Sequence, residues 1–332
     1  MSEDEIGIIG GSGFIGSALA EHLDGLFKIR ILDVKQVSKD LESKVNFQRC
    51  DIRNYNDLKE KLRGVDLVIH TAIIQIPLIN ENKKLGYEVN VKGIQNVCEA
   101  VYNIDSIRGF LLTGSWHVFG EREFRSVINE EFGFRPDKME ERAKFYALTK
   151  IAQETIARFY DEISEKVYGI IRIGTVLGEG MPEKTAANIF ITEGLKGGII
   201  TPFKHSMYRP MLYVDIDDVC KGFEIFAKNI LNDRIGKKTE SLAHIVNLMW
   251  PRSMTILDLA RVVRETIIVE SQDQIKPEIE VVDKKRPTLY SSNNEIITVD
   301  CEQTKRFFEL NKLTSPQESI ARIVRQRFAS KN

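Results

Sequence analysis

The stretch Ile6-Gly-Ile-Ile-Gly-Gly-Ser-Gly-Phe-Ile-Gly16 decides the fold of this chain. It opens with a short apolar run typical of a buried strand, continues with glycines at three-residue spacing, and leads directly into a helical pattern. Glycines lack a Cβ atom, so they permit a tight turn and let the backbone approach a pyrophosphate, while the start of the helix offers unpaired N–H groups to that anion. The stretch therefore predicts a dinucleotide loop whose cofactor contacts are Gly10, Gly13, Phe14, Ile15 and Gly16.

An acidic residue follows this loop at the distance that such a site requires. Asp33 ends the second apolar run, 20 residues after Gly13. A carboxylate there accepts hydrogen bonds from the adenosine ribose hydroxyls and repels a 2′-phosphate. We therefore predict NAD rather than NADP as the cofactor, although Lys35 is close enough to soften that preference.

Short runs rich in Ile, Val and Leu alternate with amphipathic stretches through the first half of the chain, which is typical of βαβ units. We predict an α/β fold with a Rossmann-like, doubly wound parallel sheet that is covered on both faces. Residues 1–174 form the dinucleotide-binding domain, and residues 175–332 form a smaller, mixed α/β substrate lobe. The two are interleaved, because a strand near 243–249 returns to the sheet. The expected strands are 6–9, 27–32, 45–49, 67–70, 110–113 and 168–172, and the expected helices are 14–23, 55–62, 85–101, 145–163, 255–268 and one after Ser315.

The composition narrows the class of function. The 332 residues include 47 basic and 48 acidic side chains, so the net charge of −1 provides no field for nucleic acid or membrane. No run approaches the roughly 18 apolar residues of a membrane span, and the acidic start is unlike a secretory signal. We expect a cytoplasmic protein without a metal site, whose widely spaced cysteines are buried free thiols: Cys50, Cys98, Cys220 and Cys301.

A tyrosine and a lysine in Lys144-Phe-Tyr-Ala-Leu-Thr-Lys150 form the second informative pattern. Tyr146 and Lys150 are four residues apart, so on a helix they share one face. An ammonium near a phenol stabilises the phenolate and lowers the tyrosine pKa from its usual value of about 10. Such a tyrosine can exchange a proton with a substrate hydroxyl or carbonyl near neutral pH. Because the pair follows a predicted dinucleotide loop, we predict hydride-transfer chemistry.

Together, these motifs make the chain resemble the extended short-chain dehydrogenase/reductase family, in its NAD-dependent epimerase/dehydratase branch, from about residue 5 to residue 250. The resemblance implies a catalytic serine, tyrosine and lysine, which are Ser115, Tyr146 and Lys150 here. It also implies that the two long helices before and after the serine pair across a two-fold axis in a homodimer. The further cofactor contacts that it implies are Asp51 and Ile52 at the adenine, with Thr71, Ala72 and Asn90.

The residues after Ser115 distinguish reactions within this family. Dehydratases of the family usually carry Asp-Glu there, because eliminating water needs an additional acid and base, whereas this chain has Trp116 and His117. We interpret both as substrate-pocket residues, although His117 could also move a proton. Epimerisation at one carbon needs only the tyrosine, the lysine and NAD. The leading hypothesis is therefore a nucleotide-sugar 4-epimerase.

Two arginines fit the diphosphate of such a substrate, and one threonine does not fit the pattern. Arg209 and Arg286 fall where the family contacts phosphate, and guanidinium suits that ligand. Thr175 stands where the family often has a substrate-contacting asparagine. The sequence around it looks more like that of branches that act on steroid-type or other small alcohols and ketones. The alternatives are therefore a dehydrogenase/reductase of a smaller alcohol or ketone and, more remotely, a non-catalytic dinucleotide-sensing protein.

Overall fold

The computed structural model describes residues 3–124, 126–236, 242–288, 290, 296–310 and 312–330. Its centre is a seven-stranded parallel sheet with the strand order β3-β2-β1-β4-β5-β6-β11. This order, with a crossover between β1 and β4, confirms the predicted Rossmann-like fold class. The strands are β1 (Glu5–Ile9), β2 (Lys28–Asp33), β3 (Asn46–Arg49), β4 (Leu67–His70), β5 (Gly109–Ser115), β6 (Val167–Ile173) and β11 (Ile245–Leu248).

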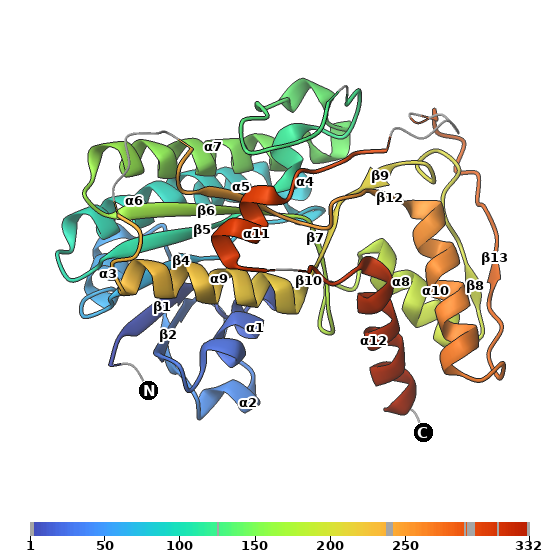
Figure 1. The fold of residues 1–332 in the computed structure, drawn as a ribbon, viewed down its shortest axis with the longest axis horizontal. Helices are drawn as coiled ribbons and strands as arrows, with labels where there is room; N and C mark the ends of the chain where they lie inside the picture. Colours follow the sequence, from blue (N-terminus) through green and yellow to red (C-terminus); the bar gives the residue numbers. More distant parts are fainter. Residues whose placement is uncertain are drawn as a thin grey trace.

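Helices cover both faces of the sheet (Figure 1). Strands β4, β5 and β6 are buried along their whole length, as expected for a parallel sheet between two helical layers. One layer contains α3 (Tyr55–Lys61), α6 (Ile94–Asn103) and α7 (Glu141–Ile163), and the other contains α1 (Phe14–Leu23), α9 (Ile216–Leu231) and α11 (Glu302–Phe308).

The helix predicted over 85–101 is interrupted. The chain forms α5 (Lys83–Tyr87), then a π-helical turn (Glu88–Gly93), and only then α6. A Cβ on Gly93 would lie 2.4 Å from Ile52, so the turn packs closely on the loop after β3. Such π turns recur at functional sites, and apolar periodicity in the sequence does not reveal them.

Most of the elements that follow β6 form a smaller lobe on one side of the sheet domain, at the carboxyl ends of the strands (Figure 1). Segments from the second half of the chain lie in both parts, because β11 pairs with β6 and α9 packs on the sheet. The lobe consists of β7 (Thr175–Leu177), α8 (Ala186–Leu195), β8 (Ile199–Ile200), β9 (Pro210–Met211), β10 (Tyr213–Asp215), β12 (Met254–Thr255), α10 (Ile256–Glu270), β13 (Glu278–Ile279) and α12 (Pro316–Ala329).

Helix α12 joins the lobe to the sheet domain. A capping box between Ser315 and Glu318 starts it, as the sequence predicts. Arg322 donates two hydrogen bonds, of 2.8 and 2.7 Å, to the carboxylate of Asp215, which is the N-cap of α9. The apolar side chains of Ile320, Ile323 and Val324 are fully buried. The last helix is therefore part of the core that holds the smaller lobe in place.

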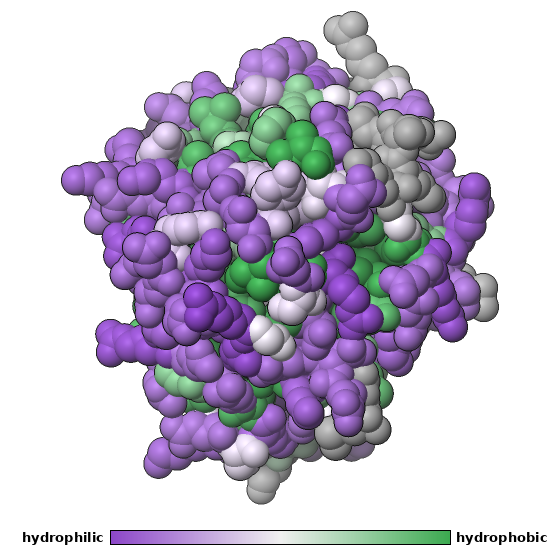
Figure 2. Space-filling model, turned by 90° about the vertical axis from the view of Figure 1, so that its left-hand side faces the viewer, coloured by the Kyte–Doolittle hydropathy of each residue, from purple (hydrophilic) through white to green (hydrophobic). Residues whose placement is uncertain are grey.

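Figure 2 shows the end of the molecule opposite the lobe, where polar residues dominate and hydrophobic residues form only small patches. Within the described ranges, none of the helices has the length and apolar character needed to cross a membrane. The four cysteines are free and buried, as predicted. Among the same residues, no cluster of His, Cys, Asp and Glu is arranged to hold a metal ion.

Candidate active site

The glycine loop forms a cradle at the carboxyl end of β1. Gly10 has φ +81°, and a Cβ there would lie 2.5 Å from the backbone nitrogen of Ala72. A Cβ on Gly16 would lie 2.3 Å from the carbonyl oxygen of Gly10. The N-cap of α1 is Gly13, so no side chain caps the first turn of this helix. The cradle thus fits the pyrophosphate of a dinucleotide, with the helix N–H groups as donors.

Asp33 lies at the end of β2, beside this cradle. Its Oδ2 accepts a hydrogen bond from the Ser12 backbone nitrogen at 3.1 Å, and its Oδ1 accepts one from the Lys35 backbone nitrogen at 2.9 Å. Each carboxylate oxygen keeps a second acceptor site. The backbone therefore orients the carboxylate and leaves it able to accept from ribose hydroxyls, as predicted for NAD.

Asp51, which is predicted to contact the adenine, forms an ion pair with Arg53. Arg53 Nη2 lies 2.6 Å from Asp51 Oδ2, and Arg53 Nη1 lies 3.2 Å from Glu88. This hydrogen bond lowers the pKa of Asp51 despite partial burial. Ile52, its neighbour, is buried against Gly93. A surface pocket of about 430 Å³ opens here, lined by Asp51, Arg53, Asn54, Glu88 and Lys92.

Asn90 connects the loop after β4 to the helix that carries the tyrosine. Its Oδ1 accepts from the backbone nitrogen of Ile74 at 2.7 Å, and its Nδ2 donates to the Ile74 carbonyl at 3.0 Å and to Thr149 Oγ1 at 3.1 Å. Thr71 Oγ1 donates to the Gly10 carbonyl at 3.0 Å. Thr71 and Asn90 therefore fix the loop that borders the cofactor cradle.

The three predicted catalytic side chains converge at the end of β5. Ser115 is the last residue of β5, and Lys150 on α7 donates from Nζ to the Thr113 carbonyl at 2.8 Å. Burial raises the pKa of Tyr146 to about 12, against a hydrogen bond with Ser115 that lowers it. Burial also lowers the pKa of Lys150 to about 7. The predicted lowering of the Tyr146 pKa is therefore wrong for the protein chain itself, because desolvation of the phenolate outweighs its neighbours.

Trp116 and His117 also face this site. His117 Nδ1 lies 3.2 Å from Ser115 Oγ, and its ring stands edge-on to the Tyr146 ring with the centroids 5.4 Å apart. Trp116 is buried and donates from Nε1 to Thr175 Oγ1 at 3.3 Å. The structure thus brings three predicted pocket residues, Trp116, His117 and Thr175, into one cluster that reaches the tyrosine through His117.

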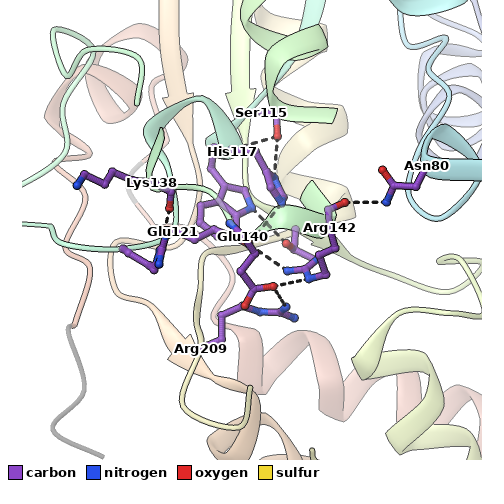
Figure 3. Close-up of polar contacts among 11 residues, drawn as sticks. Asn80, Ser115, His117, Glu121, Lys138, Glu140, Arg142 and Arg209 are labelled. Atoms are coloured by element: carbon purple, nitrogen blue, oxygen red, sulfur yellow. Dashed lines mark hydrogen bonds and ion pairs between the residues drawn. The ribbon is translucent and has the colours of Figure 1, made fainter. Parts of the chain in front are cut away.

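A buried ionic network lies directly behind His117 (Figure 3). Arg209, which precedes β9, donates from Nη1 to Glu140 Oε2 at 3.1 Å. Arg142 donates from Nε to the same oxygen at 2.5 Å and from Nη2 to Glu121 Oε1 at 3.1 Å. Glu121 Oε2 accepts from the backbone nitrogen of Glu140 at 3.0 Å, and Glu121 Oε1 lies 4.0 Å from His117 Nε2. We name these side chains, Glu121, Glu140, Arg142 and Arg209, the four-residue ion network.

Burial and charge act against each other in this network. Burial raises the pKa of Glu121, which is fully inaccessible, above its ordinary value. Burial would also raise the pKa of Glu140, but Arg209 and Arg142 outweigh it and hold that pKa below the ordinary value. Burial first, and then the neighbouring cations, lower the pKa of His117 to about 3, so its imidazole is neutral at pH 7.

Sequence reasoning found only Arg209 in this network. Glu121, Glu140 and Arg142 carry no motif, and their spacing reads as an ordinary polar loop leading into a helix. The second predicted arginine, Arg286, lies on the segment after β13 and is exposed, whereas the Arg209 side chain is 14% exposed. The two arginines therefore occupy different environments.

The comparisons with known proteins agree with this geometry. The model of the NAD dependent epimerase/dehydratase family matches residues 6–238. The chain belongs to this family. The resemblance drawn from the motifs is thereby confirmed, as are the expectations of an enzyme and of NAD as the family's cofactor.

Among curated relatives of this family member, a putative UDP-glucose 4-epimerase of Methanocaldococcus jannaschii is 31% identical over 249 residues, which is 70% of this chain and 77% of that protein. The decarboxylating sterol-4-alpha-carboxylate 3-dehydrogenase of Bos taurus is 30% identical over 148 residues, which is 44% of this chain and only 39% of that protein. The similar proteins therefore include one named as a sugar-nucleotide epimerase and one named as a sterol dehydrogenase.

Solved structures of low identity share the fold of this epimerase/dehydratase-family chain. The UDP-glucose 4-epimerase of Thermus thermophilus, in complex with NAD, superimposes with a TM-score of 0.76 at 21% identity, covering 98% of this chain and 99% of that one. MoeE5 in complex with UDP-glucuronic acid and NAD gives a TM-score of 0.77 at 18% identity, with the same coverage. At these identities, the likeness supports the fold alone.

Proposed function

We propose that this chain is an NAD-dependent nucleotide-sugar 4-epimerase. The observation that carries the proposal is the convergence of Ser115, Tyr146 and Lys150 at the carboxyl end of β5, with Arg209 reaching toward them from the lobe. Together with NAD as the hydride acceptor, serine, tyrosine and lysine are sufficient for reversible oxidation of one hydroxyl. The arginine supplies the guanidinium that a diphosphate would need.

The chemistry needs one proton acceptor and one oxygen-positioning group. Tyr146 takes the proton from the substrate hydroxyl, and Ser115 Oγ hydrogen-bonds the same oxygen and orients it. Bound NAD supplies the hydride acceptor and later the hydride donor. After the keto sugar has turned its other face, Tyr146 returns the proton to the oxygen, so each turnover releases no net proton.

Lys150 sets the protonation of the pair. With a pKa of about 7, its ammonium loses a proton near neutral pH, whereas burial keeps the proton on Tyr146. Moving the tyrosine proton to the neutral lysine yields a phenolate beside an ammonium, which is the active arrangement.

A second candidate is a dehydrogenase that acts on a smaller, uncharged alcohol or ketone. The specific observation in its favour is that Glu140 already neutralises Arg209 in a buried ion pair. Trp116 and Thr175, which meet beside the tyrosine, would suit an apolar substrate as well as a sugar.

The two candidates differ in the ligands that stabilise the folded protein. Melting curves of the NAD-loaded protein are compared with and without excess UDP, TDP or GDP. A ligand at about 100 times its dissociation constant stabilises the folded state by about 2.7 kcal/mol. We expect a clear upward shift with one of the three nucleotides. No shift with any of them, together with steady NADH production from a secondary alcohol, would contradict the epimerase and favour the dehydrogenase.

We also infer a homodimer. Helices α6 and α7 present apolar side chains that are 41–54% exposed: Tyr102, Leu148, Phe159 and Ile163. An apolar set of this kind on two neighbouring helices suits a helix-packed contact between copies of the chain. Light scattering should give twice the mass of one chain, and Phe159→Glu should give a monomer. A monomeric parent protein would contradict this inference.

A further inference from the structure

Glu140 forms an ion pair with Arg209, the arginine that would bind the diphosphate of the proposed substrate. Its Oε2 lies 3.1 Å from Arg209 Nη1, and Glu140 itself is only 7% exposed. The pair is buried and lies close to His117, rather than on the solvated surface (Figure 3). A buried ion pair is not screened as a surface pair is, so it competes effectively with any other anion.

We propose that Glu140 is an internal competitor for Arg209: it holds the guanidinium until an anionic group of the substrate, a diphosphate, displaces it. This inference rests on the proposed function for the identity of the anion. It assigns Glu140 as a residue that sets the substrate affinity and specificity of the pocket.

Arg142 makes this exchange feasible, because it shares the carboxylate. Arg142 Nε donates to the same Glu140 oxygen at 2.5 Å, closer than Arg209 does. When Arg209 turns to a phosphate, Glu140 therefore keeps a cationic partner and does not become a buried, unpaired charge, which would be strongly destabilising. Arg142 is 40% exposed, so it can adjust to the new position of the carboxylate.

The charges within the network favour an exchange over simple addition. Two arginines face two glutamates, so the cluster is balanced when both carboxylates are ionised. A diphosphate added to this cluster would meet the negative charge of Glu140 beside Arg209. The competitor thus lowers affinity for every anion and favours those with enough charge to displace a carboxylate.

The position of Glu140 also connects this exchange to the catalytic helix. Glu140 is the N-cap of α7, six residues before Tyr146, and its backbone nitrogen is bonded to Glu121. Glu121 in turn faces His117, whose ring contacts Tyr146. Binding of the substrate to Arg209 would therefore change the contacts of Glu140 at the start of α7, the helix that carries Tyr146.

The test is calorimetric titration of UDP into the NAD-loaded protein. Glu140→Gln removes the competitor and keeps the side-chain shape, so UDP should bind about ten-fold more tightly, the worth of one charge-assisted hydrogen bond. Arg142→Gln leaves Arg209 as the one arginine paired with Glu140 in the network. Glu140 should then hold Arg209 more strongly, so UDP should bind several-fold more weakly. Glu193→Gln is the matched control: it removes the same charge from an exposed pair with Lys196 and should leave the affinity unchanged.

The outcomes separate this inference from the proposed function. If the parent protein binds no UDP and the Glu140→Gln variant does, the competitor is supported and the dehydrogenase candidate gains. If the parent binds UDP and Glu140→Gln binds it equally or more weakly, the competitor is overturned while the epimerase proposal stands. Binding by neither protein also overturns the competitor. Should Glu140→Gln fail to fold, the sign of the Arg142→Gln effect decides, since tighter or unchanged binding contradicts the inference.

Discussion

The proposed cofactor side and the proposed substrate side of the candidate site are built in different ways. On the cofactor side, a continuous stretch of backbone forms the cradle, and Gly10 and Gly16 leave no room for a side chain. On the substrate side, a four-residue ion network joins segments that are far apart in the sequence. The first kind of site depends on local conformation, whereas the second depends on tertiary packing of charges. A site that depends on local conformation can be predicted from the sequence, whereas a site that depends on tertiary packing cannot.

The largest expected effect falls where the two sides meet, at the proton acceptor. Tyr146→Phe removes the group that exchanges the proton, and general acid–base catalysis contributes about 10²–10⁴-fold. Turnover should fall by about that factor while NAD affinity stays nearly unchanged. Activity equal to that of the parent would contradict the catalytic assignment.

A buried ion pair outside the network should have a large effect on stability. Arg172 Nη2 lies 2.6 Å from Glu154 Oε1, and both side chains are at most 2% exposed. Glu154→Ala leaves an unpaired guanidinium in the core and should lower the free energy of unfolding by about 3–5 kcal/mol. The exposed Glu193–Lys196 pair is the control, where Glu193→Ala should cost about 0–1 kcal/mol. Equal losses in chemical denaturation would contradict the difference in burial.

The cradle should respond to a single methyl group. Gly16→Ala places a Cβ 2.3 Å from the Gly10 carbonyl oxygen, so the turn must shift away from its anion-binding conformation. NAD affinity should fall about ten-fold or more, while Gly133→Ala, at a position with open space and no positive φ, should leave it unchanged. Retained NAD affinity in Gly16→Ala would show that the loop is not the cofactor cradle.

A final prediction concerns the pH dependence of turnover. The pKa of Lys150 is lowered to about 7 by burial, so the Tyr146–Lys150 pair loses its proton as the pH rises through that value. Below pH 7 the turnover rate should fall, approaching ten-fold for each pH unit, and above it the rate should level off. Lys150→Met should remove this limb along with most activity. A rate independent of pH between 5 and 8 would contradict the assignment.

The fold was predictable because its signals are local. Helix α1 and strand β4 have the bounds that apolar periodicity predicts, and β11 lies within the predicted range 243–249, since each is continuous in sequence and buried on a regular face. The break at the π-helical turn Glu88–Gly93 was not predictable, because it depends on packing against the loop after β3.

The candidate catalytic side chains could be proposed from a motif, but their electrostatics could not be predicted. Spacing puts Tyr146 and Lys150 on one helix face, yet the direction of the Tyr146 pKa follows from how much protein surrounds the phenol. Likewise, Arg209 was identified by its place in the chain, but its partner Glu140 is 69 residues away in sequence. Such pairings arise only once the lobe is docked on the sheet.

The most direct test of the central claim is an NMR time course of UDP-glucose, or of the sugar of whichever nucleotide shifts the melting curve, with the NAD-loaded protein. The account predicts that the 4-epimer appears without accumulation of NADH and that Tyr146→Phe forms none. Unchanged sugar in the presence of bound nucleotide, or NADH accumulating in step with a ketone product, would contradict it.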